Sequence, residues 1–449
     1  MNKFAEYKNL NLTETAKTIA EFWKNNDTFK KSVEIRQGQP EFVFYEGPPS
    51  ANGMPGIHHV MARAIKDIFC RYQTQNGKQV FRKARWDTHG LPVELGVEKE
   101  LGITKEDIGK KISIEEYNEA CRNAVMRYTD VWNDMTEKIG YWVDMENPYI
   151  TYKPKYMESV WWLLKQIYNK GLIYKGYTIQ PYSPKAGTGL SSHEVNQPGA
   201  YRDVTDTTVV AQFKTLPETL PSFLQGFGDV HFLAWTTTPW TLPSNTALTV
   251  GPKIDYVLVK TFNQYTFEPI NIVLAKPLVG KQFGKKYVEG SDEDFANYTS
   301  EKKTIPYQIL AEFKGADLVG IKYEQLLDYA KPYQNPENAF RVISGDFVTT
   351  EDGTGIVHTA PTFGADDAKV AKEASPEVPP MLVLDDNGNP VPLVDLQGRF
   401  LSVVNDEIYG FANEYVKSEY LNDEEKATEF NIQKENLKSI IADLKAYLS

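Results

Sequence analysis

The pattern of apolar and polar residues predicts a helical beginning, a mixed α/β middle and a β-rich remainder. Apolar residues at helical spacing over 16–23, behind a cap at Thr13, predict an N-terminal helix. The stretch 41–45 alternates like a strand, a Gly/Pro-rich loop follows it, and helical periodicity resumes over 60–72. A second strand over 79–84 completes a β-α-β unit, in which ligands bind at the carboxyl ends of the strands.

The later pattern changes from helical to β-like. Helical spacing dominates over 103–171, and we assign the aromatic residues near its end, over 160–168, to the core. Short β-like runs follow Tyr201, at 231–235, 256–260, 270–275, 341–344 and 381–384. The turn sequence at 386–388 predicts a hairpin, and an apolar face over 437–448 predicts a final helix.

Composition limits the classes of protein to consider. With 449 residues, 41% of them hydrophobic, the chain can form two or three domains. No run approaches the ~18 apolar residues of a membrane span and no signal peptide is recognised, so we expect a cytoplasmic protein. Cys70 and Cys121, without a Cys-x-x-Cys pair, support neither a disulfide framework nor a structural zinc site. The net charge of −11 argues against broad attraction to nucleic acid but leaves a local basic track open.

Two adjacent imidazoles, of His58 and His59, stand where the helix after the first glycine-rich loop is predicted to begin. Helix N-termini with neighbouring cationic donors favour phosphate, so the loop fits a triphosphate site. A Gly/Pro turn followed by an ordinary exposed histidine pair explains the same spacing equally well. From the residues alone, Asp87 after the second strand could cap a helix or a turn.

A second candidate site combines threonines with a histidine and two carboxylates. Three consecutive threonines, 236–238, end an apolar run, and a later strand-like run contains His358 and leads to Asp366 and Asp367. The threonines alone are typical of a β-branched strand end. Combined with the histidine and the carboxylates, they predict a hydrolytic pocket.

Four motifs, in this order, resemble those of the class I aminoacyl-tRNA synthetases, and within them the isoleucyl group. They are Pro-Pro-Ser-Ala-Asn-Gly with His59, Trp-Asp-Thr-His-Gly-Leu-Pro-Val-Glu, Thr-Thr-Thr-Pro-Trp-Thr-Leu-Pro-Ser-Asn and His-Thr-Ala-Pro-x-x-Gly-x-Asp-Asp. Valyl and leucyl enzymes carry Thr-Thr-Arg-Pro, whereas Trp240 after Pro239 is similar to the isoleucyl version. The resemblance implies an α/β chain, the first half of a Rossmann-like nucleotide fold with an inserted mostly-β (α+β) editing domain. We place a helical extension at 1–45, the nucleotide-fold part with a connective segment at 46–200, and the editing domain at 201–449.

The resemblance also assigns residues to the synthetic site. Its amino-acid pocket would use Gly47 and Pro48 as wall and Asp87 to bind the substrate ammonium, and its ATP site would use Pro49, Asn52, Gly56, His58 and His59. The family signature is His-Ile-Gly-His, whereas this chain has Gly-Ile-His-His, so the role of His58 stays open. No Lys-Met-Ser-Lys-Ser-like loop occurs, and the chain therefore resembles an N-terminal fragment.

The editing reaction does not need a strong nucleophile from the protein, because an aminoacyl ester is already activated. The protein must position a water, hold the substrate and stabilise the oxyanion. These tasks suit the hydroxyls of Thr236, Thr237 and Thr238. By resemblance, Asp367 would bind the substrate ammonium and His358 would line and size the side-chain pocket. Asn245 would contact the terminal adenosine or hold the threonine loop, and Asp366 would face solvent or cap a helix.

The resemblance therefore implies an enzyme that joins isoleucine to its tRNA and hydrolyses mischarged valyl-tRNA. ATP with Mg²⁺ would be a substrate of the complete enzyme, and the other partners would be the isoleucine tRNA, isoleucine and valine. We predict a monomer without a membrane partner and no metal site in this chain, any zinc belonging to a C-terminal part. Two alternatives remain: a valyl-type synthetase whose editing removes threonine, and a fragment that binds tRNA ends or a partner without turnover.

Overall fold

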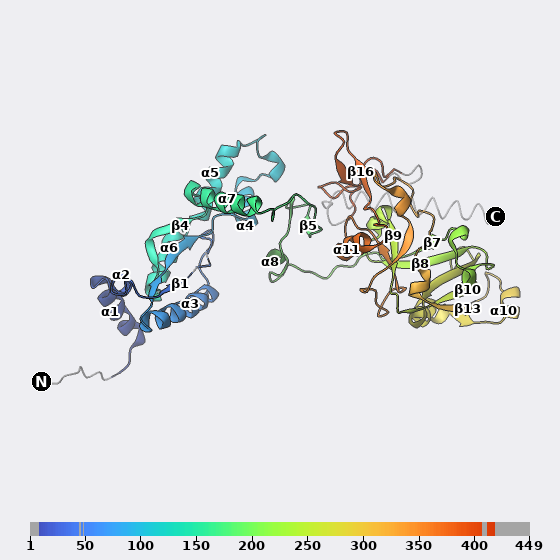
Figure 1. Cartoon of the computed structure of the whole chain (residues 1–449), viewed down its shortest axis with the longest axis horizontal. Coiled ribbons are helices and arrows are strands. Elements are labelled where there is room, and N and C mark those ends of the chain that lie inside the picture. The colour runs from blue at the N-terminus through green and yellow to red at the C-terminus, as the bar shows by residue number, and fades with distance from the viewer. Residues whose placement is uncertain (1–8, 45, 48, 406–410, 418–449) are drawn as a thin grey trace. The chain divides into compact units, whose positions relative to one another are not determined.

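The computed structural model describes residues 9–44, 46–47, 49–405 and 411–417. The chain divides into two compact units, Met1–Gly176 and Tyr177–Ser449, whose elements are traced in Figure 1. Pro48 and the predicted final helix over 437–448 lie outside the described residues.

The first unit contains the predicted β-α-β arrangement. Strand β1 (Glu41–Val43) pairs in parallel with β2 (Gln79–Phe81), and helix α3 (Ile57–Gln75) connects them. Strand β3 (Lys83–Trp86) pairs in parallel with β4 (Asp144–Ile150). The other elements are α1 (Leu12–Asn25), α2 (Thr28–Glu34), α4 (Leu91–Leu101), η1 (Lys105–Asp107), α5 (Ile114–Val125), α6 (Thr129–Lys138) and α7 (Pro154–Asn169). The loops after β1 and β3, which carry the predicted ligand-binding residues, thus leave from the carboxyl ends of parallel strands.

Four local predictions for the first unit were wrong. Asn11, and not Thr13, caps α1, because its Oδ1 accepts the Glu14 N–H at 3.2 Å. The strand expected over 79–84 is two strands, β2 and β3, and the stretch expected to be helical contains β4. The aromatic face of α7 is not core: Trp161 is 63% exposed and Tyr168 66%, and no described residue of this unit buries them.

The second unit is built on a nine-stranded mixed sheet, as its β-rich pattern predicts. The strand order is β12-β13-β10-β11-β8-β15-β9-β14, with β7 paired to β8. The strands are β7 (Val209–Lys214), β8 (Val230–Thr236), β9 (Ala247–Val250), β10 (Asp255–Phe262), β11 (Pro269–Ala275), β12 (Tyr287–Glu289), β13 (Ile305–Lys314), β14 (Arg341–Ser344) and β15 (Ile356–Thr359). The predicted hairpin at 386–388 is confirmed between β16 (Leu382–Leu384) and β17 (Pro390–Pro392).

The remaining elements of the second unit are short and lie in its connections. They are β5 (Tyr182–Ser183), β6 (Thr188–Gly189), α8 (Ser192–Val195), η4 (Pro239–Ser244), α9 (Val279–Phe283), α10 (Asp292–Ala296) and α11 (Ala365–Glu373), together with single 3-10 turns. Of these, η4 directly follows β8, and α11 follows β15 after a short loop. Both therefore start from the middle of the large sheet.

The order of the strands brings the candidate hydrolytic residues together. β8 pairs in parallel with both β11 and β15. Side chains from β8 and its neighbours, among them Phe213, Phe232, Leu258 and Ile356, form one hydrophobic cluster that holds these strands in place. Because β8 and β15 run in the same direction, the threonines after β8 and the loop after β15 leave the sheet at the same edge.

Candidate functional site

The threonine segment begins where β8 ends and turns at once into η4. The Thr236 side chain is buried, and its Oγ1 accepts the Thr238 N–H at 3.1 Å, which closes the turn. Thr237 is exposed and Thr238 is half-buried. The first threonine therefore shapes the loop, whereas the next two remain accessible to a substrate.

His358 lies on β15 and is only 6% exposed. Its Nε2 is 2.9 Å from Thr241 Oγ1, and its Nδ1 is 2.9 Å from Asn245 Nδ2. Burial lowers the pKa of this imidazole to about 4, so the ring is neutral at physiological pH. The structure thus places His358 against the threonine loop with both ring nitrogens engaged by protein groups, which makes it a support of the loop; its role as the wall of a side-chain pocket stays a prediction.

Asn245 is 2% exposed, and its amide is fully engaged by the protein. Nδ2 donates to the Ala247 carbonyl at 2.8 Å and contacts His358, while Oδ1 accepts the Tyr323 hydroxyl at 2.6 Å. The sequence left two roles open for Asn245, an adenosine contact or support of the threonine loop. The buried amide favours support.

Asp367 lies in the first turn of α11. Its Oδ2 accepts the Ala360 N–H at 2.9 Å, which ties the helix to the loop after β15. Burial raises the pKa of Asp367; the Ala360 N–H opposes this rise and the Asp366 carboxylate adds to it. Asp366 itself is exposed. Asp367 Oδ1 has no partner among the described residues, so this partly buried carboxylate is suited to hold an ammonium group.

Two contacts join the threonine segment to the segment after β15. The Trp240 and Phe363 rings lie 4.9 Å apart between centroids, at an interplanar angle of 67°. The Thr241 hydroxyl reaches His358, which is 117 residues away in the sequence. The two motifs that the sequence singled out therefore form one site.

Two residues of this site were missed at the sequence level. Thr241 is 5% exposed, and its Oγ1 donates to the Thr238 carbonyl at 2.8 Å while it also contacts His358. Its place inside the threonine motif is a signal that could have identified it. Tyr323 is 1% exposed and lies in no motif, so its sequence context does not distinguish it from an ordinary core tyrosine.

In the first unit, the glycine-rich loop over 47–56 is held by two neighbouring segments. The Pro49 carbonyl accepts the Asp87 N–H at 3.0 Å, and the Gly53 carbonyl accepts the Trp132 Nε1–H at 2.8 Å. Trp132 is itself 1% exposed. Residues predicted for the ATP site and for the amino-acid pocket thus lie side by side.

The histidine pair lies in the first turn of α3, whose N-cap is Gly56. His59 Nδ1 accepts the Gly56 N–H at 2.9 Å, so the neutral ring carries its hydrogen on Nε2. Burial, His58 and Arg63 together lower the pKa of His59 below its ordinary value of 6.5. The His58 ring lies 3.8 Å from that of His59 and covers Gly56, where an added Cβ would be 2.8 Å from it. A nucleotide approaching the backbone here requires His58 to turn away.

The other predicted pocket residues differ in their surroundings. Gly47 is exposed, and Asn52 Oδ1 accepts the Ser50 hydroxyl at 2.8 Å. The half-buried Asp87 carboxylate has no hydrogen-bond or ion-pair partner among the described residues and is therefore open to a cation. His89, which had no assigned role, contacts Thr151 Oγ1 through Nδ1 at 3.0 Å.

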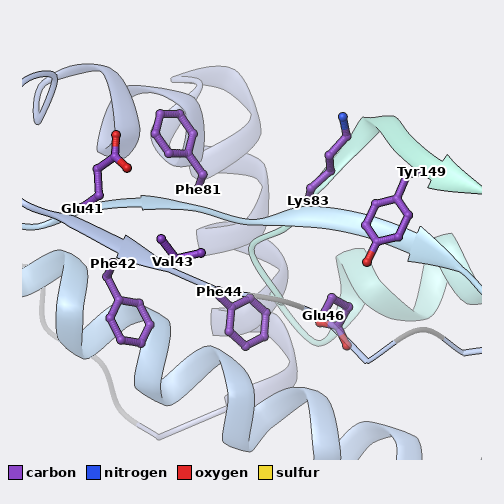
Figure 2. Close-up of a pocket in the computed structure, with 8 residues that line it drawn as sticks. All are labelled: Glu41, Phe42, Val43, Phe44, Glu46, Phe81, Lys83 and Tyr149. Carbon is purple, nitrogen blue, oxygen red and sulfur yellow. The ribbon is translucent and has the colours of Figure 1, made fainter. Parts of the chain in front are cut away.

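A cavity of about 330 Å³ lies along β1 (Figure 2). Its lining consists of Glu41, Phe42, Val43, Phe44, Glu46, Phe81, Lys83 and Tyr149. Figure 2 shows Phe42 and Phe44 on one side of their strand and Glu41 on the other, as alternate strand residues lie, with Phe81 of the paired strand β2 on the side of Glu41. None of the residues predicted to bind ATP or the amino acid lines this cavity.

Two absences hold for the part of the chain that the structure describes. None of the helices in these ranges combines the length and the hydrophobicity that a membrane span requires. No cluster of three or more histidine, cysteine, aspartate and glutamate side chains there could hold a metal ion. Both cysteines, Cys70 and Cys121, are free thiols.

Comparison with known proteins gives a consistent result. Residues 18–434 match the family described as tRNA synthetases class I (I, L, M and V). The chain is 59% identical over 446 residues to the isoleucine-tRNA ligase of Bacteroides fragilis, which covers 96% of this chain and 38% of that protein. It is 61% identical over 422 residues to the isoleucine-tRNA ligase of Cytophaga hutchinsonii, covering 94% and 36%. The chain thus spans well under half the length of these relatives.

Among solved structures, the chain is similar to the editing domain of a cytosolic leucyl-tRNA synthetase from P. knowlesi. The similarity covers 38% of this chain and 63% of that one, with 14% identity and a TM-score of 0.27. A likeness at this level is too low to support an assignment of function.

Proposed function

This chain belongs to the class I tRNA synthetases for isoleucine, leucine, methionine and valine, and from that premise we propose that it is part of an isoleucine-specific synthetase. Its 59% and 61% identity to isoleucine-tRNA ligases supports this specificity. In the complete enzyme, ATP with Mg²⁺ would activate isoleucine for transfer to tRNA. The second unit of this chain would hydrolyse tRNA mischarged with valine.

A hydrolytic site answers a chemical need of such an enzyme. Isoleucine and valine differ by one methylene, which is worth only about 1–3 kcal/mol of discrimination, and isoleucyl enzymes are themselves the standard example of this limit and of its remedy by editing. A pocket that admits isoleucine also admits valine. A second site that accepts valine and sterically rejects isoleucine supplies the missing selectivity.

One observation carries the proposal: the threonine segment and the segment from His358 to Asp367 meet at the same edge of the sheet. His358 is neutral and has both nitrogens engaged, so it does not act as a general base in this arrangement. We assign the positioning of water and ester to the Thr237 and Thr238 hydroxyls and the loop backbone. Asp367 would hold the substrate ammonium through its unpaired oxygen.

The test is hydrolysis of valyl-tRNA and isoleucyl-tRNA, both on isoleucine tRNA, by the wild-type chain and two variants. We expect the wild type to hydrolyse valyl-tRNA faster. Asp367→Ala should lose this selectivity because the ammonium loses its partner, whereas Asp366→Ala, a matched control on the exposed neighbour, should retain it. Absence of hydrolysis by the wild type would contradict the proposal. Threonyl-tRNA is assayed in parallel, and its preferential hydrolysis would favour the valyl-type alternative.

We assign to the first unit one half of an ATP and isoleucine site. The His59 Nε2–H, at the N-terminus of α3, is suited to donate to a phosphate oxygen, and the open Asp87 carboxylate is suited to bind the isoleucine ammonium. No Lys-Met-Ser-Lys-Ser-like sequence occurs in the 449 residues. We therefore expect no isoleucine-dependent ATP–pyrophosphate exchange by this chain, and measurable exchange would show that the assignment is wrong.

A further inference from the structure

Tyr323 is a buried tyrosine whose hydroxyl donates a hydrogen bond to a single acceptor. Its side chain is 1% exposed, and its ring packs in the main hydrophobic cluster, 5.3 Å from the Phe213 ring and 6.3 Å from that of Phe340. Its hydroxyl donates to Asn245 Oδ1 at 2.6 Å. A phenylalanine would fill the same apolar space without the cost of burying a hydroxyl. The hydroxyl therefore needs an explanation other than packing.

The Ala247 carbonyl and Tyr323 together determine which way the Asn245 amide faces. A carbonyl can only accept, so the atom that lies 2.8 Å from the Ala247 oxygen must be the amide nitrogen. The amide oxygen then faces Tyr323 and accepts its hydroxyl hydrogen. Both ends of the buried amide are thus matched to partners that are chemically distinct.

This orientation determines the tautomer of His358. Asn245 Nδ2 is a donor, so His358 Nδ1, at 2.9 Å from it, must accept. The neutral imidazole then carries its hydrogen on Nε2 and donates it to Thr241 Oγ1 at 2.9 Å. Thr241 in turn donates to the Thr238 carbonyl at 2.8 Å. A single direction of donation runs from Tyr323 to the threonine loop.

We infer that Tyr323 is a positioning residue of the hydrolytic site, whose hydroxyl locks the Asn245 amide, the Nε2–H tautomer of His358 and through them the Thr238 loop. Tyr323 touches neither the threonines nor a substrate position, and it acts only through the other groups. The catalytic part of this inference rests on the proposed hydrolysis of valyl-tRNA. The tautomer does not depend on that function.

The experiment compares Tyr323→Phe with Tyr256→Phe in the full chain. Tyr256 is a matched control: it is fully buried in the same cluster, and its hydroxyl donates to the Gly355 carbonyl at 2.6 Å and accepts the Gly251 N–H at 3.0 Å. Its hydroxyl has no contact with Asn245 or His358. Both variants lose a buried tyrosine hydroxyl, and only Tyr323→Phe interrupts the donor chain.

Two readouts follow. The imidazole ¹⁵N shifts of His358 at pH 7 should show only the Nε2–H form in the wild type and in Tyr256→Phe, and a mixture of tautomers in Tyr323→Phe. The turnover rate on valyl-tRNA should fall about fivefold or more in Tyr323→Phe, the change that loss of one hydrogen bond corresponds to, with little change in KM. Tyr256→Phe should stay within about twofold of the wild type.

The outcomes separate the inference from the proposed function. An Nδ1–H tautomer of His358 in the wild type would overturn the inference. This measurement needs no variant, so the inference can be refuted even if Tyr323→Phe does not fold. A pure Nε2–H tautomer in Tyr323→Phe, with turnover equal to that of Tyr256→Phe, would also overturn it while leaving the hydrolytic function intact. If the wild type hydrolyses no aminoacyl-tRNA, the proposed function is wrong. The His358 tautomers in the two variants then test by themselves whether the Tyr323 hydroxyl fixes the Asn245 amide.

Discussion

Acidification should destabilise the second unit through His358 in particular. The ordinary pKa of histidine is 6.5, and that of buried His358 is about 4. Above pH 6.5 the imidazole is neutral in both the folded and the unfolded state. As the pH falls from 6.5 to 4, the unfolded chain takes up a proton that the folded site excludes, so the free energy of unfolding decreases with falling pH.

The magnitude follows from the difference between the two pKa values. Each pH unit of difference corresponds to about 1.4 kcal/mol, so this one histidine should remove about 3 kcal/mol between pH 7 and pH 4. Below pH 4 both states bind the proton, and the contribution levels off. The structural cause is that a protonated ring cannot accept the Asn245 Nδ2–H at Nδ1, and no carboxylate among the described residues contacts the ring.

The assay is urea unfolding of the full chain at a series of pH values. Hydrogen exchange of the β8 and β15 amides at the same pH values reports on the second unit separately. His358→Gln, which cannot titrate, should lack the extra loss between pH 6.5 and pH 4. His193→Gln, a change at an exposed histidine, should follow the wild type. Parallel pH curves for the wild type and His358→Gln would refute the reasoning, because the titrating group would then lie elsewhere.

Three further predictions concern single contacts. Thr241→Val should leave His358 Nε2 without its partner, while the Thr238 carbonyl keeps the backbone N–H of residue 241, and should destabilise the second unit by about 1–3 kcal/mol in urea titration. Thr241→Ser should keep most of the stability, and an equal loss in both variants would point to packing instead. Trp132→Phe should cost the first unit about 1 kcal/mol, because it deletes the hydrogen bond to the glycine-rich loop but keeps an aromatic ring, and unchanged unfolding would show that the bond contributes nothing. Gly355 and Gly388 both have positive φ, but they differ in the space around an added Cβ. A Cβ at Gly355 would lie 2.3 Å from Ala275 Cβ, whereas a Cβ at Gly388 would have no heavy atom within 4 Å. The melting temperature should therefore fall much further for Gly355→Ala than for Gly388→Ala, and equal falls would show that the crowding contributes nothing.

The sequence by itself determined the elements with strong local patterns and the motifs they carry. Helix α3, the β-α-β arrangement of β1 and β2, the hairpin at 386–388 and the strands β8, β10, β11, β14, β15 and β16 of the second unit were predicted, because hydrophobic periodicity and turn residues are local properties. Strands β7, β9, β12 and β13 were not predicted. The threonine and His358 motifs were also identified by their residues. The prediction from local pattern was wrong where burial depends on another segment of the chain. The α7 residues have the spacing of a buried face, but no described residue of their unit covers them.

Only the tertiary structure decided how the candidate site residues are arranged. The strand order of the sheet, which no local pattern encodes, places η4 beside the end of β15 and so brings Thr241 to His358. Burial then makes the imidazole neutral, and Tyr323, from a segment without a motif, orients the amide that selects its tautomer. Protonation, tautomer and solvent access depend on atoms that meet across long sequence separations. The sequence pattern can therefore identify these residues, but their protonation states and contacts follow only from how they pack.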